Sequence, residues 1–370
     1  MNLLLLIFQS LLWPYLFFVL VIAIAMILLT INRSDRTDIS EEGESRLPFV
    51  SIVLPARNEE QSLRATLQTL IQQDYPKERI EIIVVNDRST DKTSQIAFEF
   101  SKNYPQVRLL TIESPNPHLA GKQNALHTGI LSAQGEYILI TDADCALSDK
   151  FTRLYASKLK EGHEVVFART GIKTSRTFFE LLQKLDISFL FGIAAVLQKL
   201  GYPSSAMGNN IGFSKQRYLE LGGYPAWKYS LVEDYQLVNA FRRSGAKSSF
   251  MNLYPPIVLT ESVKKVSSFF HQRQRWASAV TQGNPIVALL ACSALLLNSS
   301  WVLLFFTYPA TAFKWLLIKL LADLMLFSVI LIRFREPKNI AGFPLWWAYF
   351  QVSPLLIFLL WLAQPIKWKT

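Results

Sequence analysis

The sequence has little of several features that mark particular protein classes. Only two cysteines occur in 370 residues, Cys145 in a predicted cytoplasmic segment and Cys292 in a predicted membrane span, so a structural disulfide is not expected. The chain has neither a Gly-x-x-x-x-Gly-Lys-Ser/Thr loop nor a Gly-x-Gly-x-x-Gly loop, so it lacks the signatures of P-loop ATPases and dinucleotide-binding proteins. No nucleic-acid-binding motif is recognisable, and nucleic acid is not an expected partner.

Charge is absent from the beginning of the chain. Residues 3–31 hold no charged side chain, and about 20 helical residues are enough to cross a hydrocarbon core of roughly 30 Å. No Lys or Arg precedes this run, and no small-residue cleavage site closes it. Residues 1–31 are therefore predicted to be a retained transmembrane anchor and not a cleaved signal peptide.

Long apolar runs return near the other end, at about residues 285–308, 315–332 and 344–363. Buried core helices of a soluble domain are the alternative, but three nearly uncharged runs in succession favour membrane spans. Residues 284–370 are thus predicted to form a membrane domain of about three spans, four in the whole chain. Asp323 lies inside one run, and an ionisable group there should face the bundle interior and have a partner.

Basic residues orient the spans. They follow the first span and separate the last two, at Arg33, Arg36, Arg333, Arg335 and Lys338. Because such flanks stay in the cytoplasm, the middle of the chain is predicted to be cytoplasmic and both termini external. Lys367 and Lys369 disagree with this orientation. We expect an integral protein of a bacterial inner membrane.

The net charge of +10 is concentrated in one segment. Residues 151–283 hold 18 Lys and Arg against 8 Asp and Glu. A basic segment beside membrane spans suits anionic lipid head groups or a phosphorylated substrate.

Between the apolar ends, strands and helices alternate. After a polar linker at 32–47, strands are predicted at 49–56, 80–87, 107–112 and 137–141, and helices at 59–73, 89–103 (with Ser89 or Thr90 as N-cap) and 122–134. This order predicts an α/β domain over 48–283 with a mainly parallel sheet covered on both faces. Ligands of such sheets bind beyond the carboxyl ends of the strands.

Polar clusters follow three of these strands: Pro55-Ala56-Arg57-Asn58-Glu59, Asn86-Asp87 and Asp142-Ala143-Asp144. Asp142 and Asp144 repel each other unless a cation lies between them. Their hard oxygen atoms suit Mg²⁺ or Mn²⁺, which would neutralise a leaving diphosphate. A polar turn at the end of a strand is the alternative.

Two further clusters lie downstream. Glu233 and Asp234 begin a predicted helix, where acidic residues also commonly interact with the helix dipole. Gln272, Arg275 and Trp276 lie on a predicted helix just before the second span, where Trp and Arg also serve as interfacial anchors. The apolar stretch 176–201 either packs under the sheet or lies on the membrane surface.

Together these motifs resemble the membrane-bound branch of glycosyltransferase family 2, which includes cellulose, hyaluronan, chitin and poly-N-acetylglucosamine synthases. The shared motifs occur in the family's order over about residues 48–280: Pro55-Ala56-Arg57-Asn58-Glu59, Asp87, Gly121-Lys122-Gln123-Asn124-Ala125-Leu126, Asp142-Ala143-Asp144, Glu233-Asp234 and Gln272-Arg273-Gln274-Arg275-Trp276. The resemblance implies a GT-A-type nucleotide-sugar-binding fold. Asn86 and Arg88 depart from the family's usual Asp-Asp-Gly-Ser turn.

The resemblance also implies roles for single residues. The residues that would contact the nucleotide sugar are Pro55, Glu59, Asp87 and Lys122. The metal ion and the diphosphate would be bound by Asp142 and Asp144. Asp234 would be the general base, which implies inversion and a β-linked product from an α-linked UDP-sugar. The diphosphate and the acceptor would lie near Glu233, Gln272, Arg275, Trp276, Asn209 and Asn210.

The expected function is therefore inverting transfer of a sugar from a nucleotide sugar, expected to be UDP-linked, to a membrane-associated lipid or glycan. The modest membrane part leaves little protein to line a polymer channel, and ceramide-glucosyltransferase-like enzymes, which carry a similar end motif, glycosylate a lipid. Processive polysaccharide synthesis stays open. So do an inactive sugar-nucleotide-binding protein and a nucleotidyltransferase, although the chain lacks the basic Gly-rich first-strand loop that a nucleotidyltransferase would need.

Overall fold

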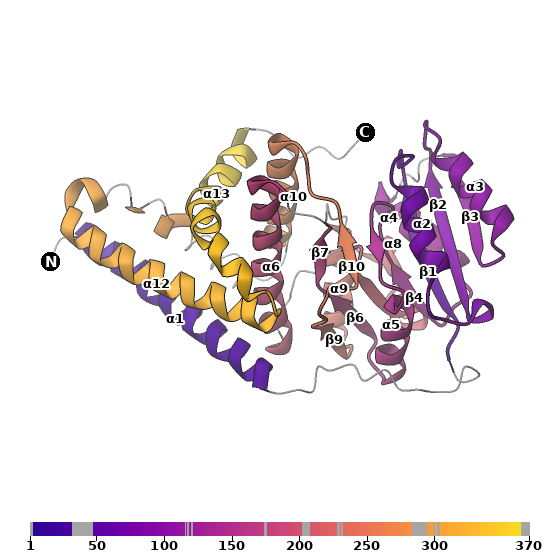
Figure 1. Ribbon diagram of the computed structural model, residues 1–370, viewed down its shortest axis with the longest axis horizontal. Helices are drawn as coiled ribbons and strands as arrows, with labels where there is room; N and C mark the ends of the chain where they lie inside the picture. Colours follow the sequence, from indigo (N-terminus) through magenta and orange to yellow (C-terminus); the bar gives the residue numbers. More distant parts are fainter. Residues whose placement is uncertain are drawn as a thin grey trace.

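The chain folds into a sheet domain at one end and a group of long apolar helices at the other (Figure 1). The computed structural model describes residues 3–31, 47–114, 116, 118–119, 121–173, 176–201, 208–227, 230, 232–282, 293, 295–298, 300–301 and 304–363. The predicted fold class is confirmed: the domain is α/β, and apolar helices stand before and after it. The predicted linker, 32–47, lies outside the described residues except for Leu47.

The main sheet has seven strands. Their order is β3 (Val107–Ile112), β2 (Ile80–Asp87), β1 (Val50–Ala56), β4 (Tyr137–Ile140), β8 (Ile211–Ser214), β6 (Val165–Ala168) and β9 (Ser248–Met251). The first four strands run parallel, and β8 is antiparallel to both β4 and β6. The four strands predicted from the sequence are these four parallel strands, with bounds that agree within one residue.

Six of the described strands were not predicted. Besides β8, β6 and β9, they are β5 (Ala146–Leu147), β10 (Val258–Thr260) and β7 (Thr170–Ile172), which form a second sheet in the order β5-β10-β7. Each is only two to four residues long. A run of that length is too short to show the alternation by which a strand is recognised in a sequence.

Alternate residues of the central strands enter two different cores. In β1, Ile52 and Leu54 pack with α2 (Leu63–Ile71), α3 (Thr93–Asn103) and α5 (Phe151–Lys160) on one face of the sheet. Val53 points to the other face, toward α4 (Lys122–Ser132) and α9 (Glu233–Arg243). This alternation follows from the two-residue period of a strand, and it covers the sheet on both sides as predicted.

The N-cap prediction for α3 was wrong. The helix begins at Thr93 with Lys92 at the N-cap, and not at Ser89 or Thr90. The Thr90 N–H donates instead to Asn58 Oδ1 at 2.9 Å, and the Asn58 N–H donates to Ser89 Oγ at 3.1 Å. Because these two residues bind the neighbouring loop, their backbone does not start the helix.

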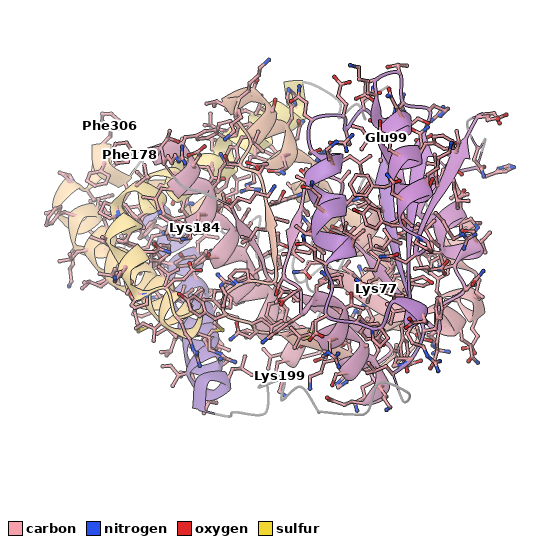
Figure 2. All side chains as sticks on the ribbon, turned by 45° about the vertical axis from the view of Figure 1, so that its right-hand side comes forward. Lys77, Glu99, Phe178, Lys184, Lys199 and Phe306 are labelled. Atoms are coloured by element: carbon pink, nitrogen blue, oxygen red, sulfur yellow. The ribbon has the colours of Figure 1, made fainter. Side chains whose placement is uncertain are left out.

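Among the described residues, three helical stretches are long and apolar enough to cross a membrane: α1 (Leu3–Ile31), α12 (Pro309–Arg333) and a stretch from Pro337 that includes α13 (Phe343–Ala363). They agree with three of the four predicted spans, and their exposed surface includes large apolar side chains such as Phe17 and Phe313. Half of the other predicted span, 285–308, lies outside the described residues. Of its described residues, Trp301 packs against Phe8 of α1, and Phe306 is exposed at the outer end of the group (Figure 2).

The α6 helix (Phe178–Lys199) lies between the sheet and the long apolar helices (Figure 1). Thr177 and Glu180 form a capping box at its start, which satisfies free N–H groups of the first turn. Gly192 lies so close to Ile330 of α12 that a Cβ there would be 2.6 Å from the Ile330 side chain. The sequence left two positions open for residues 176–201, under the sheet or on the membrane surface. The helix packs inside the protein, with one side against the sheet and the other against α12.

Asp323 has the partner that the sequence predicted. The Lys319 ammonium lies 2.6 Å from its carboxylate, and Tyr15 and Trp347 also donate hydrogen bonds to it, at 2.5 and 2.8 Å. The pair joins α1, α12 and α13 and is almost completely buried. Lys319, one turn before Asp323, was not singled out from the sequence.

The remaining described elements connect these layers. They are the helices α7 (Lys215–Glu220), α8 (Gly223–Ala226) and α10 (Val266–Gln282), and the 3₁₀ turns η3 (Lys77–Arg79) and η4 (Pro337–Gly342). The loop before η4 also touches the sheet domain: Arg169, after β6, forms a buried ion pair of 2.7 Å with Glu336.

Candidate active site

The loops that follow β1 and β2 are hydrogen-bonded to each other. Asn58 has φ 56°, a left-handed conformation that Asn adopts more readily than most residues, and its side chain accepts from Thr90. Glu59 donates its N–H to Thr93 Oγ1 at 2.7 Å and accepts a hydrogen bond from Ser62 Oγ at 2.9 Å. Pro55 pairs in register with Val85 just before these loops. The loops form one continuous rim at the carboxyl ends of the two strands.

Asp87 ends β2 on this rim. Its side chain is buried and accepts a hydrogen bond of 2.8 Å from the Nε of Arg88, which stands in place of the family's glycine. Arg88 has φ 55°, a left-handed conformation that glycine would adopt without strain. The departure from the usual turn therefore places a guanidinium directly on the predicted nucleotide-binding carboxylate.

Lys122 brings two predicted motifs together. It begins α4, and its ammonium lies 2.6 Å from Asp142 at the end of β4 and 3.0 Å from Glu233 at the start of α9. Burial by itself would lower the pKa of Lys122, but the surrounding carboxylates, Asp142 first, outweigh it and raise the pKa. The lysine is therefore a fixed positive charge between the Asp-x-Asp and Glu-Asp motifs.

Asp234 lies beside this lysine. Its two carboxylate oxygens accept 2.7 Å hydrogen bonds from the N–H groups of Gly208 and Tyr235. Burial, followed by the charge of Glu233, raises the pKa of Asp234 to about 7, although Lys122 and the two N–H groups oppose the shift. A carboxyl group with a pKa near neutrality is suited to take up and release a proton.

Gly208 also leaves space at this point. A Cβ on Gly208 would lie 3.3–3.4 Å from Asp234 and 3.4 Å from the Lys122 ammonium. That spacing is tighter than most real contacts, so a larger residue would press on the side chains of both Asp234 and Lys122. Gly208 was not predicted from the sequence, although it stands next to Asn209, which was.

Asp144 is held from the other side of the Asp-x-Asp motif. It accepts hydrogen bonds from Cys145 Sγ at 3.4 Å and from Thr260 Oγ1 of β10 at 3.5 Å. Burial, and then the neighbouring charge of Asp142, raises the pKa of Asp144. A cation bound between the two carboxylates would reverse that effect. Among the residues that the structure describes, no three His, Cys, Asp or Glu side chains are arranged to hold a metal ion by themselves.

Asn209 and Asn210 lie just after Gly208, and both are buried. The Asn209 side-chain oxygen accepts from Thr170 Oγ1 at 2.8 Å. Asn210 accepts from Tyr155 and donates to the backbone of Ala168 and Arg169. The two side chains therefore connect the residues just before β8 to β6, β7 and α5.

The motif on α10 is anchored through a residue that was not predicted. Arg273 lies 2.7 Å from Asp186 of α6 and donates to Gln272 Oε1 at 3.3 Å. Its guanidinium also stacks on the ring of Trp276, 4.2 Å from the centroid. Arg275 is partly buried on the same helix. The structure thus connects Gln272 and Trp276 to each other, and to the helix that packs under the sheet.

The structure therefore brings together Lys122, Asp142, Glu233 and Asp234, and it places Glu59 and Asp87 on the rim nearby. The supporting residues that sequence reasoning missed are Gly208, Arg273 and Asp186. Asp186 did carry a signal, because a single acidic residue on the apolar face of a helix needs a buried partner.

The sequence model described as Glycosyl transferase family 21 matches residues 15–370 of this chain. The probable glycosyltransferase YdaM of Bacillus subtilis is 30% identical over 67% of this chain and 58% of its own length. A beta-monoglucosyldiacylglycerol synthase of Nostoc sp. is 29% identical over 64% of this chain and 50% of its own length. A poly-beta-1,6-N-acetyl-D-glucosamine synthase of Staphylococcus epidermidis is 26% identical over 50% of this chain and 43% of its own length. The chain thus spans about half the length of the curated relatives it matches.

A mannosyltransferase from Pyrobaculum calidifontis, solved in complex with GDP-Man and Mn²⁺, has the same fold. It superimposes with a TM-score of 0.57 over 88% of this chain and 98% of that structure, at 19% sequence identity. The GT-A-type fold implied by the sequence motifs is therefore confirmed.

Proposed function

Because the chain belongs to glycosyl transferase family 21, it is a glycosyltransferase, and we propose that it moves a sugar, with inversion, from a nucleotide sugar to a membrane-associated acceptor. The observation that carries this proposal is the cluster around Lys122. There Asp234, with its raised pKa, lies beside a lysine that also pairs with the Asp-x-Asp motif. One carboxyl is thus able to accept a proton next to the residues that would hold a diphosphate.

The nucleoside would bind on the rim formed by the loops after β1 and β2. Glu59 and Asp87 would contact the base and the ribose, and Pro55 would shape the floor at the end of β1. The continuous hydrogen bonding between the two loops supports this assignment, because it gives the rim one fixed shape. We propose uridine as the base from the resemblance to family 2. The mannosyltransferase with the same fold was solved with GDP-Man, so guanosine is the alternative to test.

Asp142 and Asp144 would hold a Mg²⁺ or Mn²⁺ ion together with the diphosphate of the donor. A pair of carboxylates, with no group of three His, Cys, Asp or Glu side chains around it among the described residues, fits Mg²⁺, which typically takes one or two carboxylates and completes its shell with phosphate and water. When bound, the ion would supply positive charge to the departing diphosphate. Lys122 would add a second positive charge on the same side.

Asp234 would act as the general base. Its carboxylate removes the proton from the acceptor hydroxyl as that oxygen bonds to the anomeric carbon of the sugar. The bond between that carbon and the diphosphate oxygen breaks, and its electron pair leaves with the nucleoside diphosphate. Because attack and departure occur on opposite faces, an α-linked donor gives a β-linked product.

Gln272, Arg275 and Trp276 would close over the diphosphate and the acceptor. A guanidinium pairs well with phosphate, and an indole provides a flat apolar face for a sugar. Asn209 and Asn210 would shape the acceptor pocket from beneath, since both lie just after Gly208, which bonds Asp234. The anchoring of α10 against α6 and α13 supports a site that opens toward the membrane helices.

We propose that the enzyme adds one or a few sugars to a lipid or a lipid-linked glycan. The burial of Asp323 supports this, because the carboxylate that a polymer channel would use as a polar wall group is enclosed by Lys319, Tyr15 and Trp347. The similarity to a beta-monoglucosyldiacylglycerol synthase also supports a lipid acceptor. The similarity to a polysaccharide synthase favours the second candidate, processive synthesis.

The catalytic domain would face the cytoplasm, and in a bacterium the membrane would be the inner one. The basic residues Arg333, Arg335 and Lys338 support this orientation. Arg333 ends α12, and Arg335 and Lys338 follow it before α13, close to Glu336, which contacts the sheet domain.

The test is to incubate the purified protein in lipid with a panel of radiolabelled UDP- and GDP-sugars, and then to separate lipid-soluble from polymeric product. We expect the label of one UDP-sugar to appear in a lipid-soluble product, and we expect NMR to show a β-linkage in that product. High-molecular-weight polysaccharide would establish the processive alternative. Absence of turnover with every donor and acceptor lipid would reject the proposal.

A further inference from the structure

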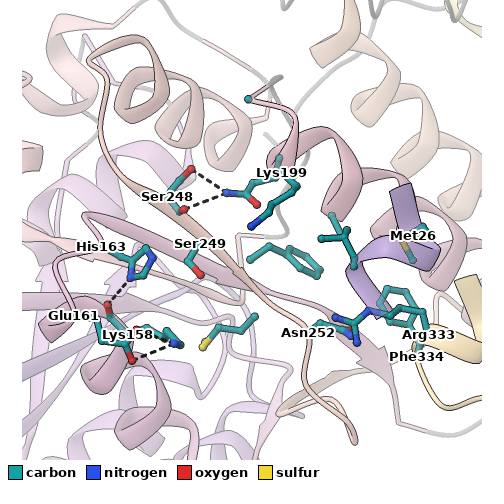
Figure 3. Close-up of a pocket in the computed structure, with 16 residues that line it drawn as sticks. Met26, Lys158, Glu161, His163, Lys199, Ser248, Ser249, Asn252, Arg333 and Phe334 are labelled. Atoms are coloured by element: carbon teal, nitrogen blue, oxygen red, sulfur yellow. Dashed lines mark hydrogen bonds and ion pairs between the residues drawn. The ribbon is translucent and has the colours of Figure 1, made fainter. Parts of the chain in front are cut away.

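A second site lies on the far edge of the main sheet from β1 and β2. A cavity of about 480 Å³ opens between the edge strand β9, the carboxyl end of α6 and the ends of α1 and α12 (Figure 3). Two strands, β8 and β6, separate β9 from β4, which carries the Asp-x-Asp motif. None of the residues placed in the candidate active site lines this cavity.

The cavity has one apolar side and one cationic side. Met26 and Leu29 of α1, with Phe334 after α12, provide apolar surface. Lysine and arginine side chains approach from α5, α6 and α12: Lys158, Lys199 and Arg333 (Figure 3). The single carboxylate among the lining residues, Glu161, lies 2.8 Å from Lys158. The lining residues therefore keep an excess of positive charge from Lys199 and Arg333.

Neutral hydrogen-bonding groups complete the cationic side. Gln198 donates to the Ser248 backbone and hydroxyl oxygens at 3.1 Å, and His163 Nδ1 lies 3.0 Å from the Lys158 carbonyl oxygen. Ser249 and Asn252 also line the cavity, and the Asn252 amide oxygen, in its hydrogen-bonded orientation, accepts from Arg333. Two cations, Lys199 and Arg333, beside neutral polar side chains suit a phosphate ester.

The cavity lies at the expected boundary of the membrane. Leu29 and Arg333 stand at the ends of two helices that are apolar and long enough to span a bilayer, on the side of the sheet domain. Next to them, Leu28 and Ile332 expose more than half of their surface. An acyl chain lying along these side chains would bring its phosphate to the level of Arg333.

We propose that this cavity binds the phosphate head group of an anionic phospholipid, whose acyl chains lie along α1 and α12. The head group would reach Arg333 and Lys199, and the edge of β9 would be covered on the membrane side. The site would tie the sheet domain to anionic lipid independently of sugar transfer, so its test does not rest on the proposed function.

A competing explanation is that Lys199 and Arg333 only balance helix dipoles, since each ends a helix at its negative pole. The two explanations differ in lipid dependence. A residue that only balances a dipole stabilises the protein equally in any lipid, whereas a head-group ligand stabilises it only when that head group is present.

The experiment uses the full chain in nanodiscs of phosphatidylcholine with or without phosphatidylglycerol. Binding of a fluorescent phosphatidylglycerol is measured for the natural chain and for the double variant Lys199→Gln/Arg333→Gln. The loss of two charges near an anionic lipid, at about 1 kcal/mol each, predicts roughly thirtyfold weaker binding. The matched control is Lys77→Gln/Lys184→Gln, which removes two lysines that stand away from the cavity (Figure 2) and should bind within about threefold of the natural chain.

A second variant keeps the charges and fills the space. Ala195→Phe places a ring in the cavity wall, and it should weaken lipid binding at least tenfold with an unchanged net charge. Three results would each overturn the proposal. The control pair could weaken lipid binding as much as the cavity variants do, or both cavity variants could bind lipid as the natural chain does. The third is that the cavity variants lose the same thermal stability with and without phosphatidylglycerol. Displacement of the fluorescent lipid by soluble glycerol phosphate would show a free-phosphate site and would also overturn it.

Discussion

The guanidinium of Arg273 lies 2.7 Å from the carboxylate of Asp186, and this ion pair joins α10 to α6 within the protein. Both side chains are nearly completely buried. Burial raises the pKa of Asp186, while the charge of Arg273 opposes the shift. Because Arg273 also contacts Gln272 and Trp276, the pair would set the position of the motif proposed to close over the donor.

Asp186→Asn is expected to destabilise the protein by about 3–5 kcal/mol, since it leaves a buried guanidinium without its counter-charge. The Michaelis constant for the donor should rise more than kcat falls, because Arg273 would position groups and not react itself. Thermal unfolding and steady-state kinetics measure the two effects. Lys184→Gln, on the same helix, is the control.

The double variant Asp186→Leu/Arg273→Met should regain stability but not donor affinity, and recovery of both would contradict a positioning role.

Asp234→Asn is expected to lower kcat by at least a hundredfold while nucleotide binding stays within a few fold. Asn keeps one hydrogen-bond acceptor for the Gly208 and Tyr235 N–H groups but cannot accept the proton of the acceptor hydroxyl. Turnover and nucleotide affinity are measured separately, by product formation and by calorimetry. A variant that retains more than about a tenth of the natural rate would show that another residue is the base.

The pH profile provides an independent test of Asp234. Because its pKa is raised to about 7, kcat/KM should rise about tenfold per pH unit below that value and level off above it. The raised pKa also means that the folded state holds a proton that the unfolded chain releases. Its contribution to stability is therefore complete below about pH 4 and is lost as the pH rises through about 7. Asp234→Asn should remove the rise of kcat/KM below about pH 7. It should also remove the loss of stability between about pH 4 and pH 7.

Metal dependence follows from Asp142 and Asp144. A chelator should abolish transfer, and added Mg²⁺ or Mn²⁺ should restore it. Asp142→Asn and Asp144→Asn should each lower kcat at least a hundredfold, as expected for the loss of several kcal/mol of charge stabilisation. Asp149→Asn, an exposed carboxylate just after the motif, should leave activity unchanged. Full turnover in excess chelator would reject the metal role.

The buried pair of Lys319 and Asp323 in α12 gives a further prediction. Asp323→Leu should lower the thermal midpoint in detergent, because it leaves the Lys319 ammonium buried without its partner. The double variant Lys319→Met/Asp323→Leu should recover most of that loss and should remain active. If the stable double variant instead fails to release product, the pair would belong to a translocation path.

The described spans show where the sequence by itself was sufficient. The apolar run 3–31 coincides with α1, and the runs 315–332 and 344–363 lie within α12 and α13. Composition decides such segments, because only uninterrupted apolar surface is stable in a bilayer. The parallel strands were also determined locally, since each is rich in apolar and β-branched residues and is followed by a polar turn or loop.

Tertiary structure decided what composition leaves open. The antiparallel β8 and the three-stranded sheet depend on hydrogen bonds between segments far apart in the chain, and strands of two to four residues carry no period of their own. The sequence predicted site roles for Lys122, Asp142 and Asp234, but only the fold places the lysine between the carboxylates and directs the Gly208 N–H at Asp234. A raised pKa depends on burial and on neighbouring charge, and both are properties of the assembled site. The Asp186 and Arg273 pair and the cavity along β9 likewise arise only where α6, α10, α1 and α12 pack together.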